Sequence, residues 1–188
     1  IYNQLINDKM TDVEKIKTIH DFIINNTVYD QERAKTVIDR TSTDFKHSSN
    51  LALGPLTTGK AICGGYTDTM ALFLDKMGIK NYKVSSDSHI WNLVYVDGAW
   101  KHLDLTWDDP VVNTGENMLL HTYFLIPYDE LLKQIQLNII LTLIFIKKQN
   151  KRMDYPFFFN FEIASSSVLT LIIFILYFFS FFVFIASL

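Results

Sequence analysis

Cysteine is nearly absent from this chain of 188 residues, in which Cys63 is the only one. A single cysteine excludes an internal disulfide framework and a metal site built from several cysteine ligands. It does not fix the redox compartment, because a lone thiol occurs on either side of a membrane. Histidines and carboxylates at a metal-site spacing are missing as well, so we expect no metal and no other cofactor.

Long basic runs are also missing from residues 1–134, which contain 13 Lys and Arg against 18 Asp and Glu. A groove that follows nucleic-acid phosphates needs clustered basic side chains. The composition therefore argues against a nucleic-acid-binding protein. The first residue is Ile1 rather than Met, which predicts an N-terminally truncated fragment, so the lack of a signal peptide is uninformative.

Charge disappears completely from residues 163–188, and residues 135–188 contain 11 of the 15 Phe. We therefore predict a soluble domain over 1–134 and an apolar tail over 135–188. A helix of 26 residues would span about 39 Å, enough to cross a hydrocarbon core of about 30 Å. Residues 163–188 thus predict a transmembrane segment and membrane association.

The tail also has a second interpretation. The basic cluster at 147–152 would stay cytoplasmic by the positive-inside rule, yet residues 135–146 are too few to carry the first domain across a membrane. Its Ile, Leu, Phe, Lys and Asn residues are typical of an AT-rich coding region read out of frame. A genuine anchor and a frameshift artefact both remain open.

Two segments have the apolar periodicity of amphipathic helices. Residues 11–26 begin with a capping box formed by Thr11 and Glu14. Residues 64–77 end at Gly78, where a C-terminal cap is expected. These two segments predict the main helices of the domain.

The remaining segments predict a loop and a sheet. Residues 27–60 show little periodicity and indicate a long surface loop with one short helix at 30–38, and such loops are more often functional or mobile than inert. The period then changes to two over 82–87, 89–96 and 99–105, which predicts three strands. Helices followed by consecutive strands indicate an α+β fold with an antiparallel sheet.

Cys63 lies between a glycine-containing loop and the start of the second predicted helix. The N–H groups and dipole at a helix N-terminus stabilise a thiolate, and they can also face a developing oxyanion. Gly64 and Gly65 keep side-chain bulk away from the sulfur. The alternative is a small buried core cysteine, which is the usual environment of a free thiol.

Asp97-Gly98 predicts a two-residue hairpin turn between the last two strands. In that register Trp91 lies opposite Asp104, and His89 shares the same face of the sheet. His89 and Asp104 are then diagonal neighbours, about 7–8 Å apart between backbones. A nucleophile, a base and an orienting carboxylate can thus come together, whereas a three-residue loop would move Asp104 to the other face.

Other histidines have simpler interpretations. His102 shares the face of His89 but lies opposite Leu93, nearer the turn, and we interpret it as a satisfied or half-exposed residue. His20 belongs to the first predicted helix, and His47 and His121 belong to loops. None of these four is predicted to act in catalysis.

Further polar and aromatic residues accompany the predicted hairpin. Asp108 and Asp109 precede a proline and indicate a turn. Trp91, Tyr95 and Trp100 share the face of His89, where they serve as packing groups or wall an acyl-binding groove.

Several motifs resemble the transglutaminase-like superfamily, in the variant found in bacterial surface and secreted proteins. The match covers about residues 12–130, and its motifs occur in the family order: NTVYD at 26–30, GKAICGGY at 59–66, KMGI at 76–79, HIWN at 89–92 and DGAWKHLDLTWDDP at 97–110. Residues 123–125 resemble the strand that follows.

The resemblance implies a papain-like fold in which the cysteine-bearing helix packs on the antiparallel sheet. It implies Cys63 as nucleophile, His89 as base and Asp104 as orienting residue, acting on protein or peptide amides through a thioester. The Cys63 backbone N–H is the expected oxyanion donor. An extracellular or cell-surface location is also implied. The alternatives are a cysteine peptidase with the same triad and an inactive surface binding module, because the superfamily includes both.

Overall fold

The computed structural model describes residues 1–111 and 118–149, with side chains through residue 141. The predicted transmembrane segment 163–188 lies outside these residues, as does most of the tail. Among the described helices, none is long and apolar enough to cross a membrane. The first compact unit runs from Ile1 to Gln149, and one helix passes through residue 134 without a break.

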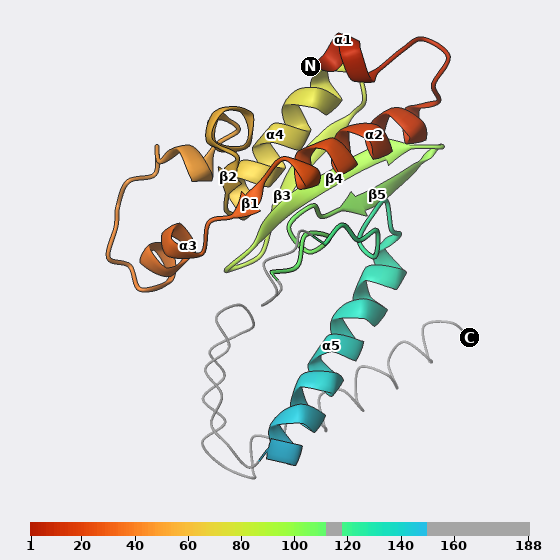
Figure 1. Cartoon of the computed structure of the whole chain (residues 1–188). Helices are drawn as coiled ribbons and strands as arrows, with labels where there is room; N and C mark the ends of the chain where they lie inside the picture. The colour runs from red at the N-terminus through yellow and green to blue at the C-terminus, as the bar shows by residue number, and fades with distance from the viewer. Residues whose placement is uncertain (112–117, 150–188) are drawn as a thin grey trace, which may run out of the picture. The chain divides into compact units, whose positions relative to one another are not determined.

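Helices and strands follow one another as an α+β chain (Figure 1). The helices are α1 (Tyr2–Leu5), α2 (Asp12–Asn25), α3 (Gln31–Ile38), η1 (Ser48–Asn50), η2 (Gly54–Thr58), α4 (Cys63–Lys76) and α5 (Tyr128–Gln149). The strands are β1 (Val28–Tyr29), β2 (Lys60–Ala61), β3 (Asn81–Ser85), β4 (Ile90–Val96) and β5 (Ala99–Leu103).

The two predicted main helices are confirmed within one residue at each end. Helix α2 begins with the predicted capping box: the Thr11 hydroxyl accepts from the Glu14 N–H at 3.2 Å, and the Glu14 carboxylate accepts from the Thr11 N–H at 2.8 Å. Helix α4 is followed by Gly78 at φ +72°, the left-handed conformation that the predicted cap requires. Local sequence signals thus account for both helices.

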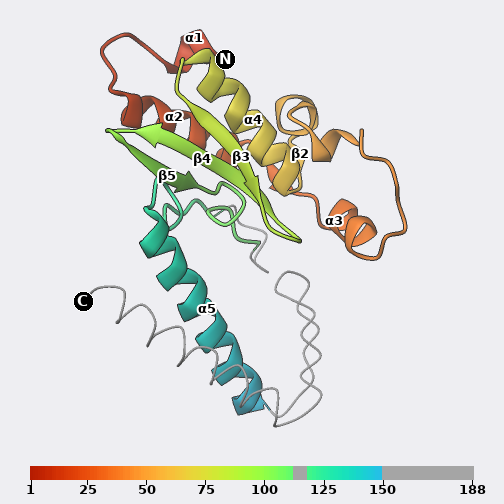
Figure 2. The same cartoon turned by 180° about the vertical axis from the view of Figure 1, so that it is seen from behind.

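Strands β3, β4 and β5 form an antiparallel sheet in that order. Helices α2 and α4 lie side by side on one face of it, as the view from behind also shows (Figure 2). Their apolar stripes form the core with the inward strand residues, namely Ile16, Ile19, Ile23, Ile24, Tyr66, Met70, Leu74, Val94 and Leu103. The core therefore fixes α4 against the sheet.

The hairpin has the predicted register. Val96 pairs with Ala99 and Leu93 pairs with His102, so the loop contains only Asp97 and Gly98. Both loop residues have positive φ, +53° and +77°, which is the backbone of the primed turn that matches strand twist.

The segment from 27 to 60 differs from the predicted surface loop. It contains the expected helix α3, but β1 pairs in parallel with β2, and η1 and η2 pack closely between them. A Cβ on Gly54 would lie only 2.2 Å from the Lys60 carbonyl oxygen. The parts that include η1, η2 and β2 are thus packed into the fold, whereas residues 39–46 are largely exposed, as a surface loop would be. The packed parts approach one another through backbone atoms, which leave no periodic pattern in the sequence.

The predicted strand at 123–125 is wrong. Residues 122–125 form turns and bends, and only Ile126 bridges to His102, through backbone hydrogen bonds of 2.8 and 2.9 Å. Leu125 has φ +50°, a left-handed conformation that interrupts an extended strand. In place of the expected strand beside β5, this segment therefore forms a single bridge before α5 begins.

Gly65→Ala tests the backbone packing at the start of α4. A Cβ at this position would lie 2.6 Å from the Ser49 carbonyl oxygen and 2.9 Å from the Ala61 Cβ. We expect the free energy of unfolding in urea to fall by about 1–3 kcal/mol. Helix propensity alone predicts the opposite sign, a gain of about 1 kcal/mol.

Leu72→Ala, at a side chain 55% exposed on the same helix, is the matched control and should have a much smaller effect. A Gly65→Ala protein more stable than wild type would contradict the packing interpretation.

Candidate functional site

Cys63 is the first residue of α4, after the extended residue Ile62, which provides no side-chain cap. The backbone hydrogen bonds at this end start with the Gly65 N–H, which donates to the Ile62 carbonyl at 2.9 Å. The N–H groups of Cys63 and Gly64 therefore lie outside the helical ladder. They bring the positive end of the helix dipole to the sulfur.

The two glycines after Cys63 have a packing role that was not predicted. A Cβ on Gly64 would lie 2.7 Å from the Asn50 carbonyl oxygen, and one on Gly65 would contact Ser49. Glycine is required here because the backbone of η1 lies directly against the helix. The Ile62 N–H also donates to the Ser49 carbonyl at 2.8 Å, so η1 fixes where the cysteine helix begins.

His89 and Asp104 both lie at the open end of the hairpin, away from its turn, and contact each other. His89 precedes β4 and Asp104 follows β5, and the imidazole Nε2 is 2.6 Å from the Asp104 Oδ2. The other carboxylate oxygen accepts from the Trp107 N–H at 3.2 Å. Both oxygens of a buried carboxylate thus have partners, which fixes the plane of the Asp104 side chain.

The His89 ring lies between two indole rings. Its centroid is 5.6 Å from Trp91 at an interplanar angle of 17° and 5.0 Å from Trp107 at 3°. Trp91 was predicted as a packing or groove residue, whereas Trp107 had no predicted role. Stacking on both faces restricts rotation of the imidazole and limits its exposure to 13%.

The charge on His89 depends on its neighbours. Burial lowers the pKa of His89, but the hydrogen bond to Asp104 and the interaction with Cys63 outweigh it and raise the pKa to about 9. The effect of Cys63 on this pKa shows that its side chain is a close neighbour of the same imidazole. Because Nε2 contacts Asp104, Nδ1 is the nitrogen left for the sulfur. The structure thus brings together Cys63, His89 and Asp104 from three separate places in the sequence.

His102 is a satisfied histidine, as predicted. Its Nδ1 accepts a hydrogen bond from the Trp91 indole N–H at 2.9 Å, and burial lowers its pKa. Tyr95 and Trp100 pair across the hairpin, and the Trp100 ring contacts those of Tyr95 and Tyr82. They pack the far end of the sheet and do not wall the site.

Tyr29, on β1, is a neighbour of Cys63 for which no role was predicted. Burial raises the pKa of its phenol strongly, and negative charge on Cys63 and Asp30 raises it further. Tyr29 therefore remains a neutral phenol near the sulfur. Its motif was visible in residues 26–30, but the parallel pairing of β1 with β2, which brings it beside Cys63, was not.

Asp108 and Asp109 form the predicted turn, but both are buried and bonded. The Tyr66 hydroxyl, one helical turn after Cys63, donates to the Asp109 carboxylate. The Asp108 Oδ2 lies 3.2 Å from the Nε2 of His20, on α2. The turn that begins at Asp104 is thus connected to both core helices.

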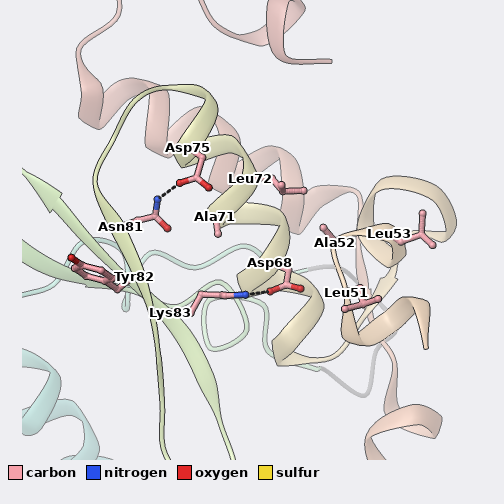
Figure 3. Close-up of a pocket in the computed structure, with 10 residues that line it drawn as sticks. All are labelled: Leu51, Ala52, Leu53, Asp68, Ala71, Leu72, Asp75, Asn81, Tyr82 and Lys83. Atoms are coloured by element: carbon pink, nitrogen blue, oxygen red, sulfur yellow. Dashed lines mark hydrogen bonds and ion pairs between the residues drawn. The ribbon is translucent and has the colours of Figure 1, made fainter. Parts of the chain in front are cut away.

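A groove of about 530 Å³ lies between α4, β3 and the segment joining η1 to η2 (Figure 3). Two polar pairs cross it: Lys83 with Asp68 at 2.8 Å and Asn81 with Asp75 at 2.8 Å. Its apolar lining comes from Leu51, Leu53, Ala71, Leu72 and Tyr82. None of its lining residues is Cys63, His89 or Asp104.

Asp109 provides a test of the turn through the pH dependence of stability. Burial raises its pKa from 3.8 to about 6, against the opposing effects of the Tyr66 hydrogen bond and of His20. A carboxyl group whose pKa is higher in the folded than in the unfolded protein stabilises the fold fully at a pH below its unfolded pKa. This contribution is lost as the pH rises through its folded pKa. The contribution of Asp109 to the free energy of unfolding should therefore fall between pH 3.8 and about 6.

The variant Asp109→Asn keeps an acceptor for Tyr66 but cannot ionise. We expect denaturant titrations to show that the stability of Asp109→Asn rises relative to that of wild type as the pH increases across this range. Asp8→Asn, at an exposed position, should behave as wild type. Parallel wild-type and Asp109→Asn curves would contradict the predicted titration.

Comparison with known proteins places these observations in a family. The sequence model of the transglutaminase-like superfamily matches residues 1–105. The kyphoscoliosis peptidase of Mus musculus is 25% identical over 141 residues, covering 64% of this chain and 20% of that protein. The chain thus spans about a fifth of the length of this curated relative.

Two solved structures are also similar. One, described as a TGase, has 26% identity and a TM-score of 0.46, and the match covers 52% of this chain and 27% of that one. The other, assigned as a cysteine protease from Cytophaga hutchinsonii, has 16% identity and a TM-score of 0.42, with 63% and 39% covered.

Proposed function

Because the chain belongs to the transglutaminase-like superfamily, we propose that it is a cysteine enzyme acting on protein or peptide amides. The observation that carries the proposal is the position of His89 between Asp104 and Cys63. In this proposal Cys63 is the nucleophile, His89 transfers protons, and Asp104 orients the imidazole. No part of this chemistry requires a cofactor.

The first step forms a thioester. The Cys63 sulfur attacks the amide carbonyl carbon, and the carbonyl oxygen becomes an oxyanion facing the Cys63 backbone N–H. The C–N bond then breaks, and the leaving amine takes its proton from His89. An imidazole with a pKa of about 9 is protonated at neutral pH, so His89 can donate the proton in this step.

The second step is set by the acceptor. His89, now neutral, takes a proton from an incoming amine or water, which attacks the thioester carbon and expels the Cys63 thiolate. An amine gives acyl transfer and water gives hydrolysis. Hydrolysis is the second candidate function, and the name of the mouse relative, a peptidase, favours it. A location outside the cell or at its surface remains a prediction from the resemblance.

Thiol labelling tests the proposed pair of Cys63 and His89. With His89→Ala we expect iodoacetamide to label Cys63 at least about tenfold more slowly at pH 6, because the cation that stabilises the thiolate is lost. His102→Gln is the matched control and should label within a few-fold of wild type. Equal, slow labelling of all three proteins would support the inactive binding module instead.

Incubation with a library of glutamine-containing peptides tests the reaction itself. We expect mass spectrometry to find a thioester adduct on Cys63. Adding a primary amine should give a transamidated product from a transferase and free acid from a peptidase. The Cys63→Ser variant should lose turnover while its circular dichroism remains that of wild type. Full activity in Cys63→Ser would refute the proposed nucleophile.

A further inference from the structure

We propose that His20, Asp21 and His121 form a binding site for a divalent transition metal such as Zn²⁺. The three ligand atoms lie within 4.8 Å of one another. His20 Nδ1 is 2.9 Å and His121 Nε2 is 2.7 Å from the same oxygen, Asp21 Oδ1. Two imidazole nitrogens and one carboxylate oxygen are a donor set that Zn²⁺ accepts with a water in the fourth position.

A buried carboxylate lies behind the first ligand. The other ring nitrogen of His20 contacts Asp108 Oδ2 at 3.2 Å, and both side chains are fully buried. Asp108 is oriented in turn, because its Oδ1 accepts from the Tyr123 N–H at 2.9 Å. A carboxylate that binds the second nitrogen of a ligating histidine fixes its tautomer and raises its basicity, as is usual at metal sites. This contact orients Nδ1 of His20 toward Asp21.

The second oxygen of Asp21 is already engaged. Lys17 forms an ion pair with Asp21 Oδ2 from one turn earlier in α2. Oδ1 is therefore the oxygen presented to both imidazoles, which favours a monodentate carboxylate ligand. The hydrogen bonds from Lys17, His20 and His121 together outweigh the burial that would raise the Asp21 pKa, and they lower it to about 2.

A metal ion fits the spacing of these atoms after a small movement. Bonds of about 2.0–2.1 Å in a tetrahedral site separate neighbouring donor atoms by about 3.3 Å. The present separations of 2.7 and 2.9 Å are a few tenths of an ångström shorter. A divalent ion would replace the two protons that otherwise occupy these contacts. The side chains of His121 and Asp21 are 37% and 23% exposed, so the ion can enter from solvent.

No metal site was expected here, because these ligands have no recognisable spacing in the sequence. His121 and Asp21 are separated by 100 residues, and they meet only because the segment before α5 returns to α2. A bound ion would join α2 to this segment, next to the Tyr123 carbonyl that accepts the Asp104 N–H at 3.1 Å. The site does not depend on the proposed enzymatic function.

Metal titration of the full chain provides the test. Cys63 is first alkylated with iodoacetamide so that its thiol cannot bind the ion. We expect calorimetry to show one Zn²⁺ per chain, Co²⁺ to give the visible absorption of a tetrahedral site, and Zn²⁺ to raise the Tm. His121→Ala and Asp21→Asn should each weaken Zn²⁺ binding at least tenfold. His47→Ala, at a histidine outside the cluster, is the matched control.

The outcomes separate the alternatives. Loss of binding in His121→Ala and Asp21→Asn with retention in His47→Ala supports the site. The proposal is overturned if the alkylated chain binds no Zn²⁺ at micromolar concentration, since the cluster is then a hydrogen-bonded network only. Binding that is unchanged in His121→Ala overturns it as well. Both variants change partly exposed side chains, and circular dichroism verifies that they fold.

Discussion

The register of the β4–β5 hairpin is the constraint on which the site depends. Side chains alternate between the faces of a strand, so a slip of one residue would move Asp104 away from His89. The two-residue loop prevents that slip, because Asp97 and Gly98 both adopt the positive φ that a primed turn requires. A contact between residues 15 positions apart is thus determined by two residues at the far end of the hairpin.

The cysteine reaches this hairpin by a separate route. Helix α4 is fixed at its start by η1, whose backbone lies directly against Gly64 and Gly65. One turn further along, Tyr66 donates to Asp109, in the turn that begins at Asp104. The helix that begins at Cys63 and the turn that begins at Asp104 are therefore connected through the core, independently of the His89 side chain. This explains how elements from distant parts of the chain come together around His89.

Sequence reasoning succeeded where the signal was local. The capping box of α2, the cap at Gly78 and the Asp97-Gly98 turn each involve neighbours in the chain, and the structure confirms all three. The hairpin register followed from the turn, and with it the contact of His89 with Asp104.

Contacts that depend on tertiary packing could not be predicted in this way. Tyr29 approaches Cys63 through a parallel pairing of two short strands. His20 fits the apolar stripe of its helix in the sequence, yet in the structure its imidazole contacts Asp108, 88 residues away. The prediction of a strand at 123–125 was wrong because Leu125 adopts a left-handed conformation, which leucine disfavours. Neither periodicity nor spacing encodes such contacts, because each partner alone has an ordinary local pattern.

Trp107 shows how burial and charge act together at this site. Its indole stacks on His89 at 5.0 Å, while its backbone N–H donates to Asp104. The ring removes water from the imidazole, which by itself would favour the neutral form. The same exclusion of water strengthens the attraction between the imidazolium and the carboxylate, and Trp107 directs that carboxylate. The pKa of His89 is therefore raised even though the imidazole is buried. Trp107, which buries the ring, also positions the Asp104 carboxylate that raises the pKa.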